Sequence, residues 1–510
     1  MSIADEAGVP NRAAITVFIM LATMMSTLDT TIANVALPHI QGSVSASSDQ
    51  ITWVLTSYIV AAAIVTPLTG WLTERLGRKR LFLVVIAGFT LSSMLCGIAA
   101  SLPQIVAFRL MQGAFGAPLI PLSQALLLDI NPPAKHGQAM SIWGAGTLIG
   151  PILGPVLGGY LTDQLTWRWC FYINVPLGVI SLIGIWMFIS DERAPRGRRF
   201  DFLGYGALAL FIGAFQLLLD RGASQDWFQS LEIWTETLIA AISLWVFGVQ
   251  TLTAKQSFLD PALLTDRNFI TANVFGFFIM VLTYSTMALL PPMLQGLMGY
   301  SVMGSGMVMM PRGVGSLAAT LVVGRLVGRV DTRVLLATGL GVSGYAMWQM
   351  VQFDLSMNGW PVMISGFFQG LGAGLLFVPL STLAFATLPS RLRPEGSAIY
   401  TLVRNLGSSV GISLMQALVA QNVQKMHASL GAHVVASDPV ARAAFGPGLT
   451  AASPAGLASI DAEINRQATM VAYVDDYKLM FIITLICLPM LLFMRKPRGA
   501  RGEPIHVAVE

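Results

Sequence analysis

The sequence predicts an all-α membrane protein with fourteen transmembrane helices, arranged as two six-helix bundles with an inserted two-helix hairpin. Of the 510 residues, 55% are hydrophobic and 11% are charged, whereas soluble globular chains carry roughly a quarter charged residues. Apolar runs of about twenty residues recur along almost the whole chain, and each is long enough to cross a hydrocarbon core as a helix. The two halves also carry matching words in the same order. A water-soluble fold is therefore excluded, and no nucleic-acid partner is expected.

The apolar runs set the order of the expected helices, and each run ends at Gly, Pro or a basic cluster. With a cytoplasmic N-terminus, most of the 30 Lys and Arg residues fall in cytoplasmic segments, as the positive-inside rule requires. We therefore expect a multi-pass protein of the bacterial inner (cell) membrane with both termini in the cytoplasm. The polar segment 421–478 should be a long periplasmic loop with some amphipathic helix. The expected helices cover residues 13–36, 51–72, 81–100, 103–128, 138–160, 170–190, 201–219, 233–253, 269–292, 302–324, 333–353, 361–386, 397–420 and 479–494.

A parallel internal repeat organises these helices into domains. Gln112-Gly113 on the fourth helix corresponds to Gln369-Gly370 in the second half, and other matches follow at a similar spacing. Two similar units suit a transporter whose halves rock about a central cavity. We expect an N-terminal six-helix bundle at 13–190, a linker with two extra helices at 191–268, and a C-terminal six-helix bundle at 269–494 that includes the loop 421–478.

Metal and enzyme chemistry have little support. The three cysteines show no paired spacing, and the five histidines lie outside the expected helices. A membrane-embedded enzyme acting on lipid would need an intramembrane nucleophile with a base, or a set of metal ligands. We expect a protein that is not an enzyme, has no catalytic or metal site and no cofactor, and uses the proton gradient as its energy source.

Two charges within the first bundle are the strongest functional candidates. Asp29 lies within the first helix and Arg109 within the fourth, and neither has a charged counterpart in the second half. A charge in the bilayer centre costs at least roughly 2.5–3.5 kcal/mol, so an intramembrane ionisable residue is a functional candidate. Asp29 could carry the coupled proton while Arg109 pairs with it. The alternatives are a helix-packing hydrogen bond for Asp29 and a static ion pair for both.

A charged turn between the second and third helices suggests a gate. Gly70 and Gly77 permit close approach of helix ends, and Glu74 can bind a neighbouring helix through charge-assisted bonds. Arg75 and Arg78 complete the motif. The alternative is that the basic residues only anchor the topology.

The fifth helix carries a stripe of small residues. Gly146, Gly150, Gly154 and Gly158 recur every four residues, so they share one face and let another helix approach closely. Either a sliding seam used in alternating access or a rigid packing seam fits this pattern. Two prolines that would bend the same helix are Pro151 and Pro155.

The candidates for substrate contact lie in both halves. Arg404 could attract anionic or polar groups, or it could bond backbone carbonyls. Arg312 follows Pro311 near the end of a Met-rich run and could line the cavity. The excess of buried Arg over buried acid favours neutral or anionic amphiphiles. The candidate substrate-binding residues are Asn34, Gln112, Tyr284, Gln369 and Arg404.

Several stretches resemble the major facilitator superfamily and, within it, the fourteen-span drug:proton antiporters of the EmrB type. Residues 28–38 are similar to the first-helix signature of that group, and 70–80 to the superfamily loop motif. Glu74 stands where the loop motif more often has Asp. Further similar stretches are Arg109 with Gln112 and Gly113 on the fourth helix, 146–159 on the fifth, 167–176 and 219–222.

The resemblance implies a proton-coupled antiporter that exports amphipathic drugs and toxic compounds by alternating access. It assigns the coupling role to Asp29 and Arg109. It also allows for a tripartite efflux system, with a periplasmic adaptor protein and a TolC-like outer-membrane channel as partners beside the lipid bilayer, protons and substrates. The alternative is a dedicated exporter of one endogenous metabolite, siderophore or fatty acid, which a narrow, polar cavity would favour.

Overall fold

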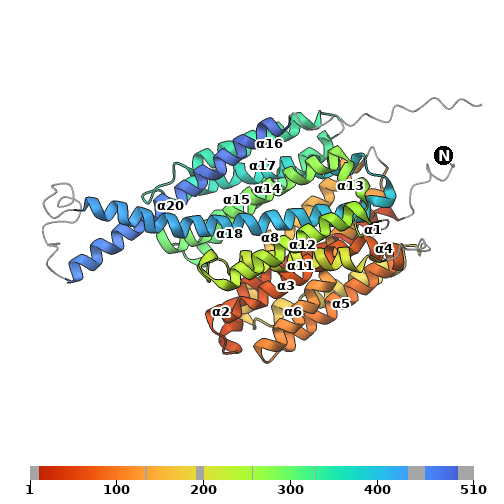
Figure 1. Cartoon of the computed structure of the whole chain (residues 1–510), viewed down its shortest axis with the longest axis horizontal. Helices are drawn as coiled ribbons and strands as arrows, with labels where there is room; N and C mark the ends of the chain where they lie inside the picture. The colour runs from red at the N-terminus through yellow and green to blue at the C-terminus, as the bar shows by residue number, and fades with distance from the viewer. Residues whose placement is uncertain are drawn as a thin grey trace, which may run out of the picture.

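The computed structural model describes residues 11–132, 135–190, 200–254, 257–327, 329–434 and 454–491, and these residues are almost entirely helical. The linker 191–199 and its arginines lie outside them. The described residues contain no β-strand, and an isolated β-bridge joins Val327 to Val330. Figure 1 shows the helices running roughly parallel to one long axis.

The first half begins with the long helix α1. Two of the predicted spans in this half are each divided into two helices by a short turn. The pair α3 and α4 is joined by a 3₁₀ turn at Thr66–Leu68, and α6 and α7 are separated at Ala117 and Pro118. The helices are α1 (Arg12–Ser43), α2 (Ser48–Ile51), α3 (Trp53–Val65), α4 (Thr69–Leu76), α5 (Arg78–Ile98), α6 (Leu102–Gly116), α7 (Leu119–Ile130), α8 (His136–Gln164), α9 (Trp169–Tyr172) and α10 (Asn174–Phe188).

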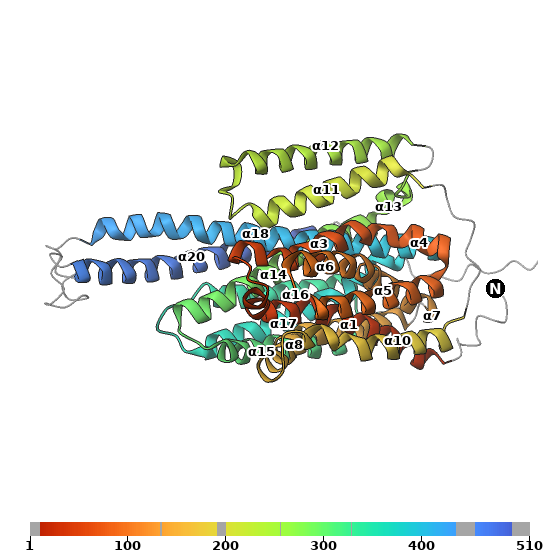
Figure 2. The same ribbon diagram turned by 90° about the horizontal axis from the view of Figure 1, so that it is seen from below.

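Two helices lie to one side of the rest. Helix α11 (Phe202–Arg221) packs on α12 (Leu231–Thr253) and also contacts α3 and α18. Figure 2 shows α11 and α12 side by side at the edge of the molecule. Trp245 and Leu252 on α12 are 70% and 80% exposed, which suits a helix whose outer face meets lipid. That this pair is an insertion between two repeats stays a prediction.

The second half has the same kind of elements. Pro291 and Pro292 end α14, and a π-helical turn, Met293–Leu297, follows. The helices are α13 (Pro261–Thr265), α14 (Arg267–Pro292), α15 (Val302–Leu326), α16 (Thr332–Met350), α17 (Gly359–Ala386), α18 (Arg393–His433) and α20 (Pro454–Met490).

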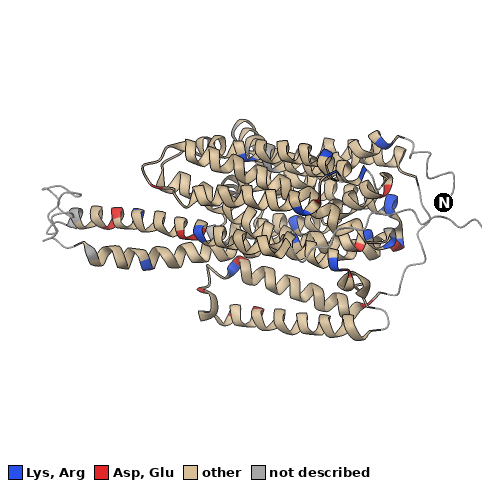
Figure 3. Cartoon of the chain, turned by 90° about the horizontal axis from the view of Figure 1, so that it is seen from above, with Lys and Arg blue, Asp and Glu red and all other residues tan. Residues whose placement is uncertain are grey.

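Ten segments within the described residues are long and apolar enough to cross a membrane. They include α1, α3 with α4, α5, α6 with α7, α10, α11, α12, α14, α15 and α17. Figure 3 shows how sparse charge is along them, with Lys and Arg gathered mainly at the end where α1 begins. A helical membrane protein is thus confirmed. Helices α8, α16, α18 and α20 fall outside this set although they pack in the same bundle, so the number fourteen stays a prediction.

The described parts of 421–478 are helical, which agrees with the expected amphipathic helix, and the place of this segment outside the membrane stays a prediction. Helix α18 continues to His433, and α20 begins at Pro454 rather than at residue 479. Both helices project beyond the bundle (Figures 1 and 2). The two helices pack on each other, and His427 lies 2.9 Å from Asp461 across the hairpin. The segment is too polar to cross a membrane, but helix propensity and the packing of α18 on α20 stabilise its helices. The polarity of a segment alone does not predict whether it is helical. Residues 435–453 lie outside the described part.

The bundle has two distinct ends. The terminal face is the end where α1, α5 and α18 begin, and the distal face is the end from which α18 and α20 project (Figure 2). The halves meet where α8 packs on α15 and where α18 packs on α4 and α7.

Candidate functional site

Asp29 and Arg109 form a buried ion pair between α1 and α6. Arg109 Nη1 lies 2.7 Å from Asp29 Oδ2, and the two side chains are 1% and 0% exposed. The pairing predicted from their isolation in apolar helices is confirmed. In a low-dielectric interior each charge requires the other, because an unpaired one would lose its hydration without compensation.

Neutral amides complete the surroundings of the carboxylate. Gln112 Nε2 donates to Asp29 Oδ1 at 2.8 Å, and its Oε1 accepts from Arg109 Nη1 at 2.8 Å. Asn174 Nδ2 donates to the same Oδ1 at 2.7 Å and to Ser93 Oγ at 3.0 Å. Asp29 thus accepts three hydrogen bonds, two of them from uncharged donors. Gln112 is fully buried in this network, and its predicted contact with substrate stays a prediction.

Aromatic rings and a close backbone contact enclose the guanidinium. Its carbon lies 4.2 Å from the ring centre of Tyr58 and 5.8 Å from that of Phe171, and Nε donates to the Val54 carbonyl at 3.1 Å. A Cβ at Gly113 would collide with the Tyr58 carbonyl oxygen. The two residues of the Gln-Gly pair thus have different roles. Gln112 belongs to the hydrogen-bond network, and Gly113 lets α3 approach α6.

The glycine stripe of α8 packs on the helix that carries Asp29. A Cβ at Gly150 would lie 2.6 Å from the backbone nitrogen of Leu28, and one at Gly158 would lie 2.9 Å from Ile32. Thr31 Oγ1 donates to the Gly150 carbonyl at 3.1 Å. Gly146 and Gly154 face Met20 and Thr31 of α1. The seam predicted from spacing is confirmed as a contact, while sliding along it stays a prediction. Pro151 and Pro155 lie in α8, and their side chains are outside the described residues.

The charged turn joins the two halves at the terminal face. Asp129 of α7 lies 2.7 Å from Arg78 at the start of α5 and 2.7 Å from Arg393 at the start of α18. A Cβ at Gly70 would lie 2.9 Å from the Cα of Glu395, so glycine lets α4 meet α18.

The remaining gate residues have varied surroundings. Glu74 is half-buried, whereas Arg75 is exposed with its guanidinium carbon 5.3 Å from the Trp71 ring centre. Gly77 has φ of 78°, a left-handed conformation that favours glycine, and it caps α4. Of the five residues predicted in this stretch, Gly70 meets α18 directly and Arg78 is joined to α18 through Asp129, while a gating role stays a prediction.

Further contacts hold the halves together towards the same face. Ser141 Oγ of α8 donates to the Thr320 carbonyl of α15 at 2.5 Å. Ser397 Oγ of α18 donates to Gln124 Oε1 of α7 at 2.7 Å. With the Asp129 bridge, these contacts close the terminal face in this conformation.

The predicted substrate residues do not form one cluster. Asn34 is exposed on α1, beyond Asp29 towards the distal face, and Gln369 donates to Thr286 Oγ1 inside the second half. Tyr284 of α14 is 38% exposed, and it follows Thr283, whose carbonyl accepts a hydrogen bond from Arg312.

Arg404 lies beside an aromatic stack that crosses between the halves. Its guanidinium carbon is 4.3 Å from the Phe377 ring centre and 5.5 Å from that of Tyr400. Phe377 of α17 in turn stacks on Trp143 of α8, with centroids 5.6 Å apart. A side chain in the second half is thereby linked to a helix of the first.

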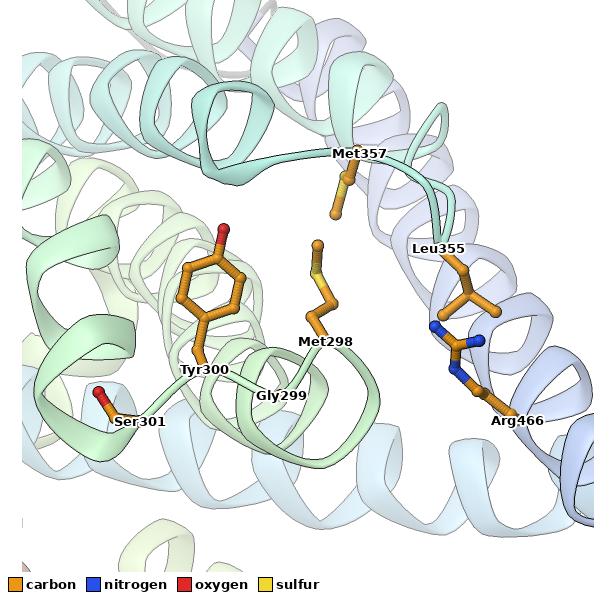
Figure 4. A pocket seen from close by; sticks show the side chains of 7 residues that line it. All are labelled: Met298, Gly299, Tyr300, Ser301, Leu355, Met357 and Arg466. Atoms are coloured by element: carbon orange, nitrogen blue, oxygen red, sulfur yellow. The ribbon is translucent and has the colours of Figure 1, made fainter.

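Two hollows lie away from these residues. A cavity of about 470 Å³ opens near the distal face, where Met298 and Met357 point towards each other and Arg466 of α20 lies on the opposite side from Tyr300 (Figure 4). A groove of about 250 Å³ runs between α1 and α8 beside Met20 and Gly146.

The sequence predicted neither of these two hollows. It also missed Asn174, Tyr58 and Asp129 as site residues. The resemblance of residues 167–176 pointed to the stretch that contains Asn174. Among the described residues, no group of three His, Cys, Asp or Glu could hold a metal ion.

Comparisons with known proteins identify the family of the chain. A family model described as Major Facilitator Superfamily matches residues 19–412. Multidrug export protein EmrB of Escherichia coli (strain K12) is 34% identical over 497 residues, covering 96% of each chain. Fatty acid resistance protein FarB of Neisseria gonorrhoeae is 34% identical over 424 residues, covering 82% of this chain and 83% of FarB. The crystal structure of the human organic anion transporter MFSD10 matches with a TM-score of 0.59 at 15% identity, over 93% of this chain and 100% of that one, which concerns the fold alone.

Proposed function

Because the chain belongs to the major facilitator superfamily and is a multidrug-efflux transporter of the inner membrane, we propose that it drives export by proton antiport through Asp29 and Arg109. The observation that carries the proposal is the buried pair itself, 2.7 Å apart and almost inaccessible to solvent. Asp29 is the group that can take up a proton, and Arg109 is a fixed positive charge that changes partner when Asp29 is protonated. A change of protonation at such a pair alters the relative free energies of two conformations.

In the proposed topology, fourteen helices cross the membrane and the terminal face is cytoplasmic. Helices α8, α16, α18 and α20 complete the ten segments that length and hydropathy identify. The basic residues gathered near the start of α1, α5 and α18 support a cytoplasmic terminal face under the positive-inside rule. Helices α11 and α12 are the inserted hairpin. The conformation described here is then closed towards the cytoplasm.

The proposed cycle exchanges a proton for a substrate. A proton entering from outside neutralises Asp29 and breaks its contact with Arg109. Helix α1 then shifts against the glycine seam of α8, and the bridge at Asp129 opens. The space between the two halves then faces the cytoplasm. Loss of the proton and binding of substrate restore the pair and reclose the terminal face.

An adaptor protein and an outer-membrane channel complete the proposal as partners. The hairpin of α18 and α20 projects on the side that the topology places in the periplasm (Figure 1). An elongated helical pair with exposed faces offers a surface to another helical protein. This arm of the proposal fails if the purified adaptor binds equally well to a chain that lacks residues 425–465.

Dye accumulation in proteoliposomes tests export by antiport. Molecules that expose their terminal face outwards should accumulate ethidium when the lumen is acidic, and collapsing the gradient with nigericin should abolish accumulation. Ethidium uptake that is equal with and without the gradient would contradict proton antiport.

A dedicated exporter of fatty acids is the second candidate, and the likeness to FarB favours it. A panel of dyes, antibiotics and fatty acids of matched length separates the two. Transport of several unrelated classes supports a multidrug exporter, and transport of fatty acids alone supports the dedicated one.

A further inference from the structure

Two arginines in the second half lie deep in the bundle. Arg312 is the eleventh residue of α15 and Arg404 the twelfth of α18, which puts them roughly 15–20 Å along their helices at 1.5 Å per residue. Among the described residues, the ion pairs found include neither of them. Arg109 in the first half, by contrast, has its acid.

Each guanidinium keeps donor capacity that the protein does not use. Arg312 is 8% exposed, and its Nη2 donates to the Thr283 carbonyl at 2.6 Å, while its buried Nη1 has no hydrogen-bond partner in the described part of the chain. Within the same residues, the buried Nε of Arg404 has no hydrogen-bond partner, and its Nη2 lies 3.8 Å from the sulfur of Met280. A thioether is a weak acceptor, so both side chains are poorly satisfied.

Helix α14 brings the two arginines near each other. Arg404 Nη2 contacts Met280 Sδ, and Arg312 Nη2 donates to the Thr283 carbonyl about one helical turn further along. Tyr284 is the next residue of α14 and is 38% exposed. The rings of Phe377 and Tyr400 flank Arg404. The cluster therefore combines two cations, a phenol and apolar ring surface.

We infer that Arg312, Arg404 and Tyr284 form a binding site for the acidic headgroup of an amphiphilic organic anion. The two guanidiniums would donate to a carboxylate or sulfonate, and the apolar tail would lie along aromatic and methionine side chains. Guanidinium groups bind planar carboxylates through paired donors, which explains why arginine rather than lysine occupies both positions. This inference rests on the proposed export function and assigns one class of its substrates, the acidic amphiphiles.

Two acids of this half are buried among the described residues, Glu395 near the start of α18 and Asp476 of α20. Asp476 is 1% exposed with one oxygen unpartnered in the described residues, and it has no ion pair with either arginine there. A bound anion would therefore supply a counter-charge that the two arginines lack within the described part of the chain.

Ligands of one tail length and different headgroup charge test the inference. Laurate, dodecyl sulfonate, methyl laurate and dodecyltrimethylammonium are to be compared for binding to the full chain in nanodiscs. We expect laurate and the sulfonate to bind at least about tenfold more tightly than the ester, since charged hydrogen bonds contribute that much or more. Equal affinity of the unaltered protein for laurate and its ester would overturn the inference without any variant.

Variants place the site. Arg312→Gln and Arg404→Gln should each weaken laurate and sulfonate binding at least about tenfold and change ester binding less than about twofold. Arg168→Gln is the matched control, because Arg168 donates to the Gly97 and Ala99 carbonyls in the other half and should leave all affinities unchanged. If a glutamine variant fails to fold, Arg312→Lys and Arg404→Lys keep the charge and should reduce the preference for acid over ester.

The outcomes separate the inference from the proposed function. Gradient-driven ethidium export together with no preference for acids would overturn the anion site alone. A preference for acids that depends on Arg312 and Arg404, with no gradient-driven transport of any compound, would overturn proton antiport alone.

Discussion

At the scale of single residues, the Asp29–Arg109 pair joins stability to function. Two charges with 0% and 1% exposure persist because each neutralises the other and because Gln112 and Asn174 supply further hydrogen bonds. Removing one member leaves the other buried and uncompensated, whereas removing both leaves neutral groups. The same property makes the pair a switch, because protonation of Asp29 removes its negative charge and leaves the charge of Arg109 uncompensated.

Arg109→Gln should lower stability more than the double variant Asp29→Asn/Arg109→Gln. Breaking a buried pair costs about 3–5 kcal/mol, and neutralising the remaining acid should restore much of that. Thermal unfolding can be followed with a thiol-reactive dye, because Cys96, Cys170 and Cys487 are all buried in the folded chain. Equal melting temperatures for the single and double variants would show that the pair does not act as a charge pair.

Sequence reasoning identified the charged members of this site and missed the neutral ones. Asp29 and Arg109 are conspicuous because charges are rare in apolar helices. Asn174 and Tyr58 are not, because neutral polar and aromatic residues recur throughout the spans and only the packing of α3 and α10 brings these two to the pair. The same limit applies to Gln112, whose role depends on which neighbour its amide meets.

At the scale of helices, the contact of α8 with α1 makes a graded prediction. Gly150→Ala should destabilise the protein by about 1–3 kcal/mol and impair transport, because its Cβ would press on the backbone of α1 at Leu28. Gly159→Ala is the matched control in the same helix, since a Cβ there meets nothing within 4 Å. Both effects can be measured by thermal unfolding and dye export, and equal behaviour of the two variants would contradict a tight seam.

Helix boundaries were predictable where hydropathy sets them and not elsewhere. Apolar runs located the membrane-crossing parts of α5 and α14 within a few residues. Helices α18 and α20 extend well past their apolar parts, because helix formation in water depends on propensity and pairing, to which a hydropathy window is insensitive. The glycine spacing of α8 predicted a close contact, but only the structure identifies α1 as the partner.

At the scale of the whole molecule, the two halves are closed at the terminal face and must separate there if access alternates. A Cβ at Gly137 of α8 would lie 2.8 Å from the Cβ of Val327 at the end of α15. A disulfide needs Cβ atoms about 3.5–4.5 Å apart, so a small local shift suffices.

The variant Gly137→Cys/Val327→Cys, with the three native cysteines replaced by alanine, should form a disulfide and lose export. Reduction should restore transport, and each single cysteine should leave it intact. Full transport by the cross-linked protein would contradict opening at this face.

The repeat in the sequence predicted two halves, and the family match confirms the superfamily fold. The words that match between halves carry no information on which face is closed, because both conformations have the same sequence. That property comes from tertiary contacts such as the bridge of Asp129 to Arg78 and Arg393.

Substrate-triggered proton movement tests proton coupling at Asp29 most directly. Proteoliposomes with a pH-sensitive dye in an acidic lumen would report proton efflux when ethidium is added outside, for the unaltered chain, Asp29→Asn and the control Asp226→Asn. Asp226 lies on an exposed turn with φ of 53°, a conformation that asparagine tolerates. We predict that ethidium triggers proton efflux in the unaltered protein and in Asp226→Asn, and that Asp29→Asn, folded and inserted, shows none. Undiminished efflux in Asp29→Asn would contradict the coupling role of the buried pair.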